Sequence, residues 1–216
     1  MEIKEDVFPE VKDTGCSVNK KIIVFDLGGV ILKFSHLSIC ERLSELSNTS
    51  ADKIYEFIFK NSLERRYETG EITSSDFYEV VIKYLKIDLG FDDFYYIWTN
   101  IFEENVEVSK IITELKKQNH KLLLLSNTNE MHFNFVKNKF DILNVFDDFT
   151  LSHIEGCRKP DISIFKKVFN KTGTSPVGHI YIDDIKENVI ASRSIGMTGI
   201  HFKNADKLKK DLAHYL

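Results

Sequence analysis

The segment Ile22-Ile-Val-Phe-Asp-Leu-Gly-Gly-Val30 decides the fold class of this chain. Four consecutive apolar residues are followed by one acidic residue, Asp26, and then, after a leucine, by two glycines. A short apolar run bounded by a turn signal is typical of a strand that is buried on both faces, as in parallel sheets. The segment therefore predicts a buried strand that stops at a glycine turn, with Asp26 at its carboxyl end.

Similar apolar runs recur along the chain, separated by segments with helical periodicity. The runs are residues 122–125 before Ser126, a weaker run at 148–151, residues 180–182 before Asp183 and Asp184, and residues 199–202. Strands that alternate with helices at this spacing indicate a parallel sheet covered on both faces. The sequence therefore predicts an α/β fold with a Rossmann-like, doubly wound parallel sheet.

Residues 37–102 interrupt the alternation, because their apolar positions follow helical periods. Four apolar stripes predict roughly four helices, and Thr73-Ser-Ser-Asp76 has the pattern of a capping box before one of them. We expect an N-terminal extension at 1–20, an α/β core at 21–35 and 105–216, and a helical cap at 36–104. The helices either only stabilise the sheet or form a lid over its carboxyl edge, where open α/β sheets bind ligands.

Polar side chains stand at the predicted strand ends, and a lysine lies in a loop between them. Asp26, Ser126 and the Asp183-Asp184 pair end three strands, and Lys159 precedes a proline. Taken alone, each feature is weak evidence for a site, because a turn, a helix cap or a solvated loop also explains it. Because the carboxyl ends of parallel strands share one edge of the sheet, their joint order predicts one site.

That order resembles the haloacid dehalogenase superfamily, most of whose members are magnesium-dependent phosphatases. The resemblance extends from about residue 21 to the end of the chain. It implies that Asp26 is the nucleophile of the first motif and that Ser126 of the second binds phosphate. It implies further that Lys159 is the lysine of the third motif and that Asp183-Asp184 is the acidic fourth motif.

Within that superfamily, three segments look most like the branch of bacterial α-D-glucose-1-phosphate phosphatases with a type-1 helical cap. They are Phe25-Asp-Leu-Gly-Gly-Val30, Leu125-Ser-Asn-Thr-Asn129 and Tyr67-Glu-Thr-Gly-Glu71. In this branch His132 also matches a histidine, although a partly buried helix histidine explains that residue equally well. The resemblance implies a small phosphorylated metabolite, such as a hexose 1-phosphate, as the substrate.

The residue types agree with phosphoryl transfer. Mg²⁺ prefers hard oxygen ligands, which Asp26, the Gly28 carbonyl and Asp184 would supply, while Asp183 would act one shell further out. Lys159 would neutralise both the nucleophile and a phosphoryl oxygen. The Ser126 hydroxyl and the backbone N–H of Asn127 would donate to another phosphoryl oxygen. An aspartyl-phosphate intermediate then divides one difficult displacement into two.

One position departs from the superfamily pattern. Most of its phosphatases carry a second aspartate two residues after the nucleophile, and this residue exchanges protons with the leaving group and with water; here Gly28 stands there. We expect a bias toward good leaving groups such as a sugar anomeric hydroxyl. A non-catalytic binding or regulatory protein stays an alternative, and so does a 2-haloacid dehalogenase, although dehalogenases have an aromatic residue at this position.

Substrate selection is expected to lie in the cap and in the entry just after the first motif, with candidate groups in the charged segment 65–71. Tyr67 and Glu68 are the first candidates for substrate contacts, although a charged loop between helices is normally solvated.

The composition limits the possible partners and the compartment. With 29 Lys and Arg against 33 Asp and Glu, the formal charge of −4 supplies no general field for nucleic acid. The three cysteines are widely spaced and odd in number, which argues against a disulfide framework. The first twenty residues lack an apolar signal run, and no stretch of the chain is long enough to span a bilayer. We expect a cytoplasmic protein with no membrane partner, and the sequence leaves its oligomeric state open.

Overall fold

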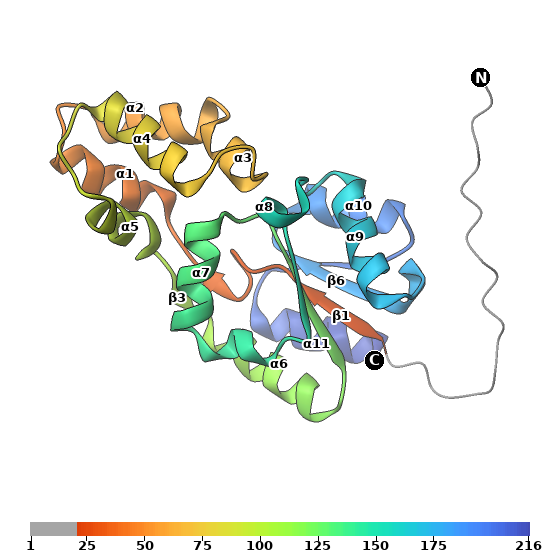
Figure 1. The fold of residues 1–216 in the computed structure, drawn as a ribbon. Coiled ribbons are helices and arrows are strands. Elements are labelled where there is room, and N and C mark those ends of the chain that lie inside the picture. Colours follow the sequence, from red (N-terminus) through yellow and green to blue (C-terminus); the bar gives the residue numbers. More distant parts are fainter. Residues whose placement is uncertain (1–20) are drawn as a thin grey trace, which may run out of the picture.

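A computed structural model describes residues 21–216 and contains a five-stranded sheet in which all strands are parallel (Figure 1). The strand order is β5-β4-β1-β6-β7. The strands are β1 (Ile22–Phe25), β4 (Lys121–Ser126), β5 (Asp148–Leu151), β6 (His179–Asp183) and β7 (Thr198–His201). This confirms the predicted α/β fold, and the expected N-terminal extension at 1–20 lies outside the described residues.

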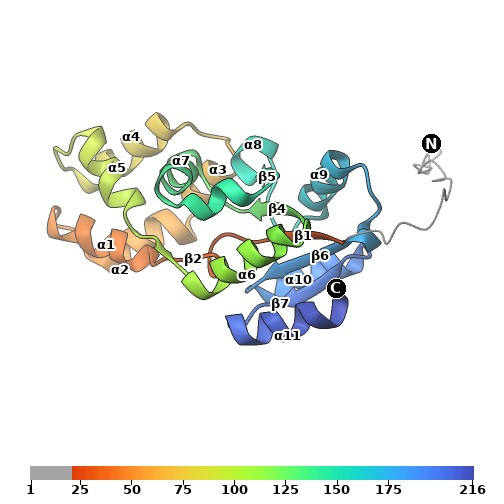
Figure 2. The same ribbon diagram turned by 90° about the horizontal axis from the view of Figure 1, so that it is seen from below.

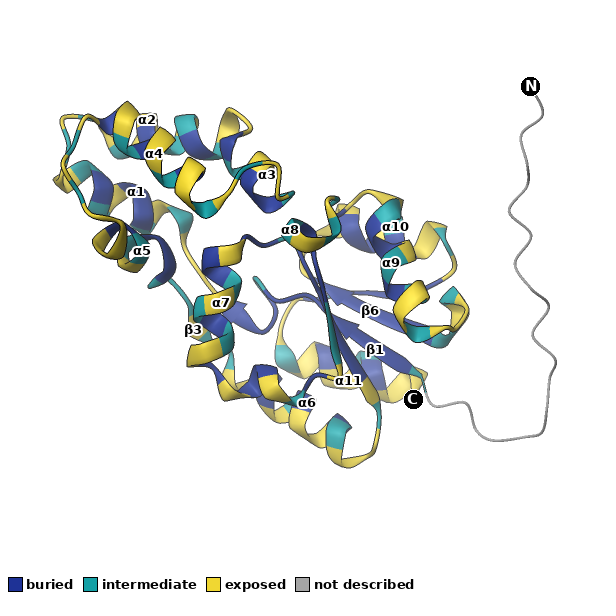
Figure 3. Cartoon of the chain, viewed as in Figure 1, coloured by how far each residue is buried: buried dark blue, intermediate teal, exposed yellow. Residues whose placement is uncertain are grey.

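Helices cover both faces of the sheet, as Figure 2 shows from below. They are α6 (Val106–Lys117), α7 (Glu130–Lys139), α8 (Ser152–Glu155), α9 (Ile162–Thr172), α10 (Lys186–Ser194) and α11 (Ala205–Tyr215), with short 3-10 turns at Asp141–Val145 and Pro176–Gly178. Side chains alternate along each strand. Ile23 and Phe25 pack with residues of α6 and α11, whereas Ile22 and Val24 pack with residues of α9. The central strands are accordingly buried on both sides (Figure 3).

A second group of helices lies between two short strands, β2 (Leu32–Lys33) and β3 (Glu103–Glu104), which pair antiparallel. We call these helices the helical insert. They are α1 (His36–Glu45), α2 (Ala51–Tyr55) with a π-helical turn at Glu56–Lys60, α3 (Leu63–Glu68), α4 (Ser74–Leu85) and α5 (Phe91–Thr99). The capping box before α4 is confirmed, since Thr73 and Asp76 bond each other's backbone N–H.

Helix α3 corrects the prediction of a charged loop around residues 65–71. Its sequence, Leu-Glu-Arg-Arg-Tyr-Glu, has only two apolar positions, but Leu63 and Tyr67 are one helical turn apart and both are buried. They join the insert's own core, which is rich in aromatic residues and includes Trp98 and Phe77. Tertiary packing therefore stabilises a helix that the local charge pattern obscures.

The described residues contain no helix that combines the length and the apolar character needed to cross a membrane.

Candidate active site

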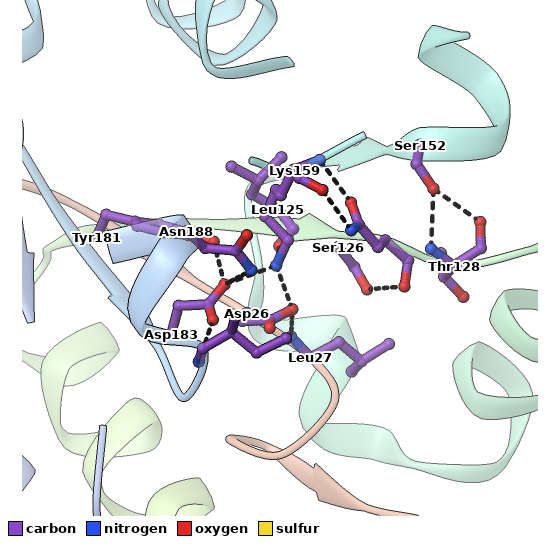
Figure 4. A network of polar contacts seen from close by, with 12 residues as sticks. Asp26, Leu27, Leu125, Ser126, Thr128, Ser152, Lys159, Tyr181, Asp183 and Asn188 are labelled. Carbon is purple, nitrogen blue, oxygen red and sulfur yellow. Dashed lines mark hydrogen bonds and ion pairs between the residues drawn. The ribbon is translucent and has the colours of Figure 1, made fainter. Parts of the chain in front are cut away.

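The ends of three central strands meet at one cleft between the sheet and the helical insert. Asp26 directly follows β1, Ser126 ends β4, and Asp183 ends β6. The register of β1 with both neighbours brings these ends level, so their side chains converge (Figure 4). The cleft has a volume of about 190 Å³, and its lining includes Asp26, Gly28, Ser126, Asn127, Lys159 and Asp184.

Lys159 lies at the centre of this group. Its Nζ is 2.7 Å from Asp26 Oδ1 and 2.8 Å from Asp183 Oδ2, and its side chain is 1% exposed. Burial alone would lower the pKa of Lys159, but the two carboxylates outweigh that effect and raise it. Burial raises the pKa of Asp26 well above its usual value, and the Lys159 charge only partly offsets this. The ammonium group is therefore held charged beside the carboxyl that would attack.

Asp183 is surrounded by hydrogen-bond donors. Besides Lys159, its carboxylate accepts from the Tyr181 hydroxyl, from Asn188 Nδ2 at 3.0 Å and from the Ile185 N–H at 2.7 Å. Burial would raise the pKa of Asp183, but Lys159 and these donors hold it below its usual value. Because its oxygens are already engaged, Asp183 is suited to positioning Lys159 rather than to binding substrate.

Three carboxylates form a group that fits a small cation. Oxygens of Asp26, Asp183 and Asp184 all lie within 4.8 Å of one another. Three acidic groups against one ammonium leave a charge that a divalent ion would offset, and carboxylate oxygens are the ligands that Mg²⁺ prefers. Gly29, with φ of +74°, leaves room for this arrangement, since a Cβ there would lie 2.2 Å from Asp184 Oδ2.

The loop after β4 positions the lysine as well as the expected phosphate contact. Ser126 is buried, and its hydroxyl lies 3.3 Å from the Asn127 carbonyl. The Asn127 side chain bonds the backbone of Lys159 twice, accepting from its N–H at 2.8 Å and donating to its carbonyl at 3.0 Å. This pair of bonds ties the second motif to the third.

The helical insert and the loop before Lys159 supply a second set of charged groups, which we call the insert-side wall: His36, Glu64, Glu68 and Arg158. Arg158 Nη1 lies 3.1 Å from Glu68 Oε2, and His36 Nε2 lies 3.5 Å from Glu64 Oε1. Burial raises the pKa of Glu64 to about 8, with a further contribution from Glu68. Burial also raises the pKa of Glu68, although Arg158 opposes the effect. The same burial lowers the pKa of His36 to about 4.

The two residues proposed for substrate contact are placed differently. Glu68 lines the cleft, whereas Tyr67 is not among its lining residues. The Tyr67 ring is 1% exposed within the insert's core, and its hydroxyl bonds Ser74 Oγ at 2.7 Å and the Met131 N–H at 3.1 Å. Tyr67 thus joins the insert to α7 and is turned away from the cleft.

His132 lines the cleft but is fully engaged in hydrogen bonds. Its Nε2 bonds the Trp98 carbonyl at 2.9 Å, and its Nδ1 bonds Asn129 Nδ2 at 3.0 Å. Burial lowers the pKa of His132 to about 3, so the ring is neutral. This arrangement favours a structural role for His132 on its helix over a role in binding substrate.

Phe34 occupies the position where a side chain at residue 28 would project. A Cβ on Gly28 would lie 2.6 Å from Phe34 Cε1. The Phe34 ring contacts His36 and Phe102, with centroid separations of 4.9 Å and 5.9 Å. An aromatic ring therefore occupies the space next to residue 28 at the core edge of the cleft.

The sequence was compared with those of known protein families. The family of haloacid dehalogenase-like hydrolases matches residues 23–202, which include every strand end described above. The chain belongs to this family. The more specific likeness to glucose-1-phosphate phosphatases is not established by that match.

Two relatives of this chain differ in what their names say they act on. A sesquiterpene phosphatase of Aspergillus oryzae is 25% identical over 191 residues, which span 86% of this chain and 91% of the relative. A chloroplast flavin mononucleotide hydrolase of Arabidopsis thaliana is 37% identical over 81 residues, covering 38% of this chain and 33% of the relative.

Solved structures support the haloacid dehalogenase-like fold. A HAD family enzyme from Bacteroides thetaiotaomicron, crystallised with magnesium and inorganic phosphate, superposes with a TM-score of 0.77 at 23% identity. The superposition covers 86% of this chain and 95% of that one.

Three ionisable residues of the haloacid dehalogenase-like cleft were missed or left unassigned from sequence: His36, Glu64 and Arg158. Arg158 directly precedes Lys159, so adjacency was an available signal. Glu64 and Glu68 are four residues apart and share a face of α3, a relation that follows only once the segment is known to be helical. His36 carries no such signal, since its place depends on how α1 packs.

Proposed function

We propose that this chain is a magnesium-dependent phosphatase that hydrolyses a small phosphorylated metabolite through an aspartyl-phosphate on Asp26. The observation that carries the proposal is that Asp26, Ser126, Lys159 and Asp184 line one cleft. A structural role alone does not require these four residues, distant in sequence, to meet. The buried Lys159–Asp26 contact of 2.7 Å supports a carboxyl that is prepared to approach an anionic ester.

Within this proposal, Asp26, Asp184 and the Gly28 carbonyl would hold the metal, and Asp183 positions Lys159. Bound magnesium would supply positive charge that offsets the repulsion between carboxylate and phosphate. Ser126 and the Asn127 N–H donate to a phosphoryl oxygen. Residues 21–35 and 105–216 form the catalytic core, and residues 36–104 form the cap that completes the cleft.

A sugar phosphate such as a hexose 1-phosphate is the proposed substrate. Glu68 and Arg158 present charged hydrogen-bonding groups to the cleft, which suit sugar hydroxyls better than a hydrocarbon chain. The volume of about 190 Å³ accommodates a phosphate and a small organic group. The proposal places the protein in the cytoplasm, acting on a free metabolite and on neither nucleic acid nor membrane.

Phosphate release from a substrate panel tests the function. The panel contains hexose 1-phosphates, flavin mononucleotide, a sesquiterpene phosphate and p-nitrophenyl phosphate, each with magnesium or EDTA. We expect release that requires magnesium and is abolished by Asp26→Asn, which keeps the side chain's shape. Release that survives this substitution would mean that another site or a contaminant is responsible. Binding of the esters without turnover by the unaltered chain would favour the non-catalytic alternative.

A further inference from the structure

The proposed phosphatase reaction needs a proton donor for the leaving group, and the usual position for it holds none. Gly28 carries no side chain, and the Phe34 ring lies where one would project. General acid help is worth about 10²–10⁴-fold in rate, so an active enzyme gains from another donor in the same cleft. The remaining candidates among the described residues are the ionisable groups that line it.

Most of these groups have no proton to give. Both ring nitrogens of His132 are engaged, one by the Trp98 carbonyl and one by Asn129. Lys159 is held by two carboxylates. Arg158 stays charged and is paired with Glu68 at 3.1 Å. None of these three groups therefore offers a transferable proton at neutral pH.

Glu64 differs from its neighbours on the insert-side wall. Its side chain is 14% exposed, and its Oε1 lies 3.5 Å from His36 Nε2. The His36 ring is held by stacking on Phe59, with centroids 4.3 Å apart, and by contact with Phe34. Glu64 is thus a largely buried carboxyl, next to a neutral imidazole, that lines the same small cleft as the nucleophile.

We propose that Glu64 replaces the missing aspartate as the general acid and base, a role that rests on the proposed phosphatase function. As an oxygen of Asp26 bonds to phosphorus and the bond to the leaving oxygen breaks, the Glu64 proton passes to that oxygen and yields the free alcohol. Water then attacks phosphorus, its proton returns to the Glu64 carboxylate, and the bond to Asp26 breaks to release phosphate.

The electrostatics of the wall support this role. Burial and the neighbouring Glu68 raise the pKa of Glu64 to about 8, opposed by Arg158, while the facing His36 is neutral because burial lowers its pKa to about 4. Glu64 is therefore protonated at neutral pH and can be deprotonated within the catalytic cycle. By contrast, Glu68 lies 3.1 Å from Arg158, whose charge opposes the effect of burial on the pKa of Glu68.

Leaving-group dependence tests the proposal. In Glu64→Gln, we expect kcat/KM for hexose 6-phosphates, whose alkoxide is a poor leaving group, to fall about 10²-fold or more, because kcat/KM reports the steps up to release of the alcohol. The kcat/KM for p-nitrophenyl phosphate, whose leaving group needs no proton, should be little changed, whereas kcat falls for both substrates where hydrolysis of the shared aspartyl-phosphate limits the rate. The matched control is Glu79→Gln, which removes an exposed carboxylate from α4 outside the cleft.

The pH profile provides a second readout that a structural role would not move. For alkyl phosphates, kcat/KM of the unaltered chain should fall above a pH of about 8, and Glu64→Gln should lose this limb. Thermal melting of each variant verifies that it folds. Equal losses of kcat/KM on both substrates, or unchanged kcat/KM on both, would overturn the role of Glu64. Failure of the unaltered chain to release phosphate from any ester would instead reject the phosphatase function itself.

Discussion

The two sides of the cleft hold their charges in different ways. On the core side, Lys159 contacts Asp26 and Asp183 at 2.7 Å and 2.8 Å, and the whole group is buried. On the insert side, Arg158 meets Glu68 at 3.1 Å with its side chain 34% exposed. Glu68 Oε2 has no hydrogen bond of good geometry within residues 21–216.

This difference separates a rigid reacting centre from a wall that retains unused hydrogen-bonding capacity. A fully bonded group holds its geometry before substrate arrives, as phosphoryl transfer requires. A partly bonded group can pair with a ligand instead, which suits recognition and proton exchange. Lys159 belongs to the fully bonded core side and its neighbour Arg158 to the partly bonded insert side. Single substitutions of these two residues therefore test the contrast.

The largest expected effect comes from Lys159→Met. Its removal leaves Asp26 and Asp183 buried without a cation, and breaking a buried pair in this way costs about 3–5 kcal/mol of unfolding free energy. Arg158→Met removes an equally charged neighbour from the partly exposed pair and should cost about 1 kcal/mol or less. Urea denaturation with EDTA present, so that no metal substitutes for the lysine, measures both.

Similar losses of unfolding free energy in the two variants would contradict the difference between the core side and the insert side. A small effect of Lys159→Met would mean that the carboxylates are better hydrated than their burial indicates. A large effect of Arg158→Met would mean that Glu68 depends on its partner as strongly as Asp26 does.

The second effect concerns His132, where the insert meets the loop after β4. Burial lowers the pKa of His132 from 6.5 to about 3. A group whose pKa falls on folding stabilises the folded state above its unfolded pKa, and this contribution is lost as the pH falls. Between pH 7 and pH 5 the loss is about 2 kcal/mol.

A difference between variants isolates this contribution. Glu64 acts in the opposite direction, because its raised pKa makes the folded state relatively more stable as the pH falls. We therefore expect the stability of the unaltered chain, relative to His132→Gln, to drop by about 2 kcal/mol from pH 7 to pH 5. His214→Gln, at an exposed site on α11, is the control. Parallel stability curves for all three proteins would show that His132 is not buried as described.

The core side of the site could be predicted from sequence because its residues end strands. Once 22–25, 122–125 and 180–182 are recognised as parallel strands, Asp26, Ser126 and Asp183 must share an edge. The fold class and these strand positions are confirmed with small differences at their ends. The chemical roles of the residues stay predictions.

The insert side could not be predicted in the same way, because no short pattern describes it. Glu64 faces the cleft only because α3 is helical, and α3 is helical because Leu63 and Tyr67 pack into the insert's core. The local charges indicated a loop, in which Tyr67 was a candidate for substrate contact, whereas the helix places its ring in the insert's core. Likewise, Phe34 fills the space next to Gly28 because of the path that the chain takes around β2. No sequence motif specifies that path.

The smallest expected effect on stability comes from Gly28→Asp, which places a carboxyl where most phosphatases of the superfamily carry one. Gly28→Asp places a Cβ 2.6 Å from Phe34 Cε1, but the Phe34 ring is 41% exposed and can turn toward solvent. The substitution should therefore cost only about 1 kcal/mol of unfolding free energy. Phe34→Ala in the same chain should remove that cost, and urea denaturation of the single and double variants measures the difference.

The same pair of variants sharpens the contrast between the two walls. If the proton donor has moved from residue 28 to Glu64, then Gly28→Asp with Phe34→Ala should restore alkyl phosphate turnover to Glu64→Gln. Gly28→Asp alone should restore less, because the Phe34 ring still competes for the space. Equal turnover with and without the Phe34 change would mean that the ring does not control this position. Failure of both to restore activity to a folded protein would mean that the insert-side wall contributes more than a proton.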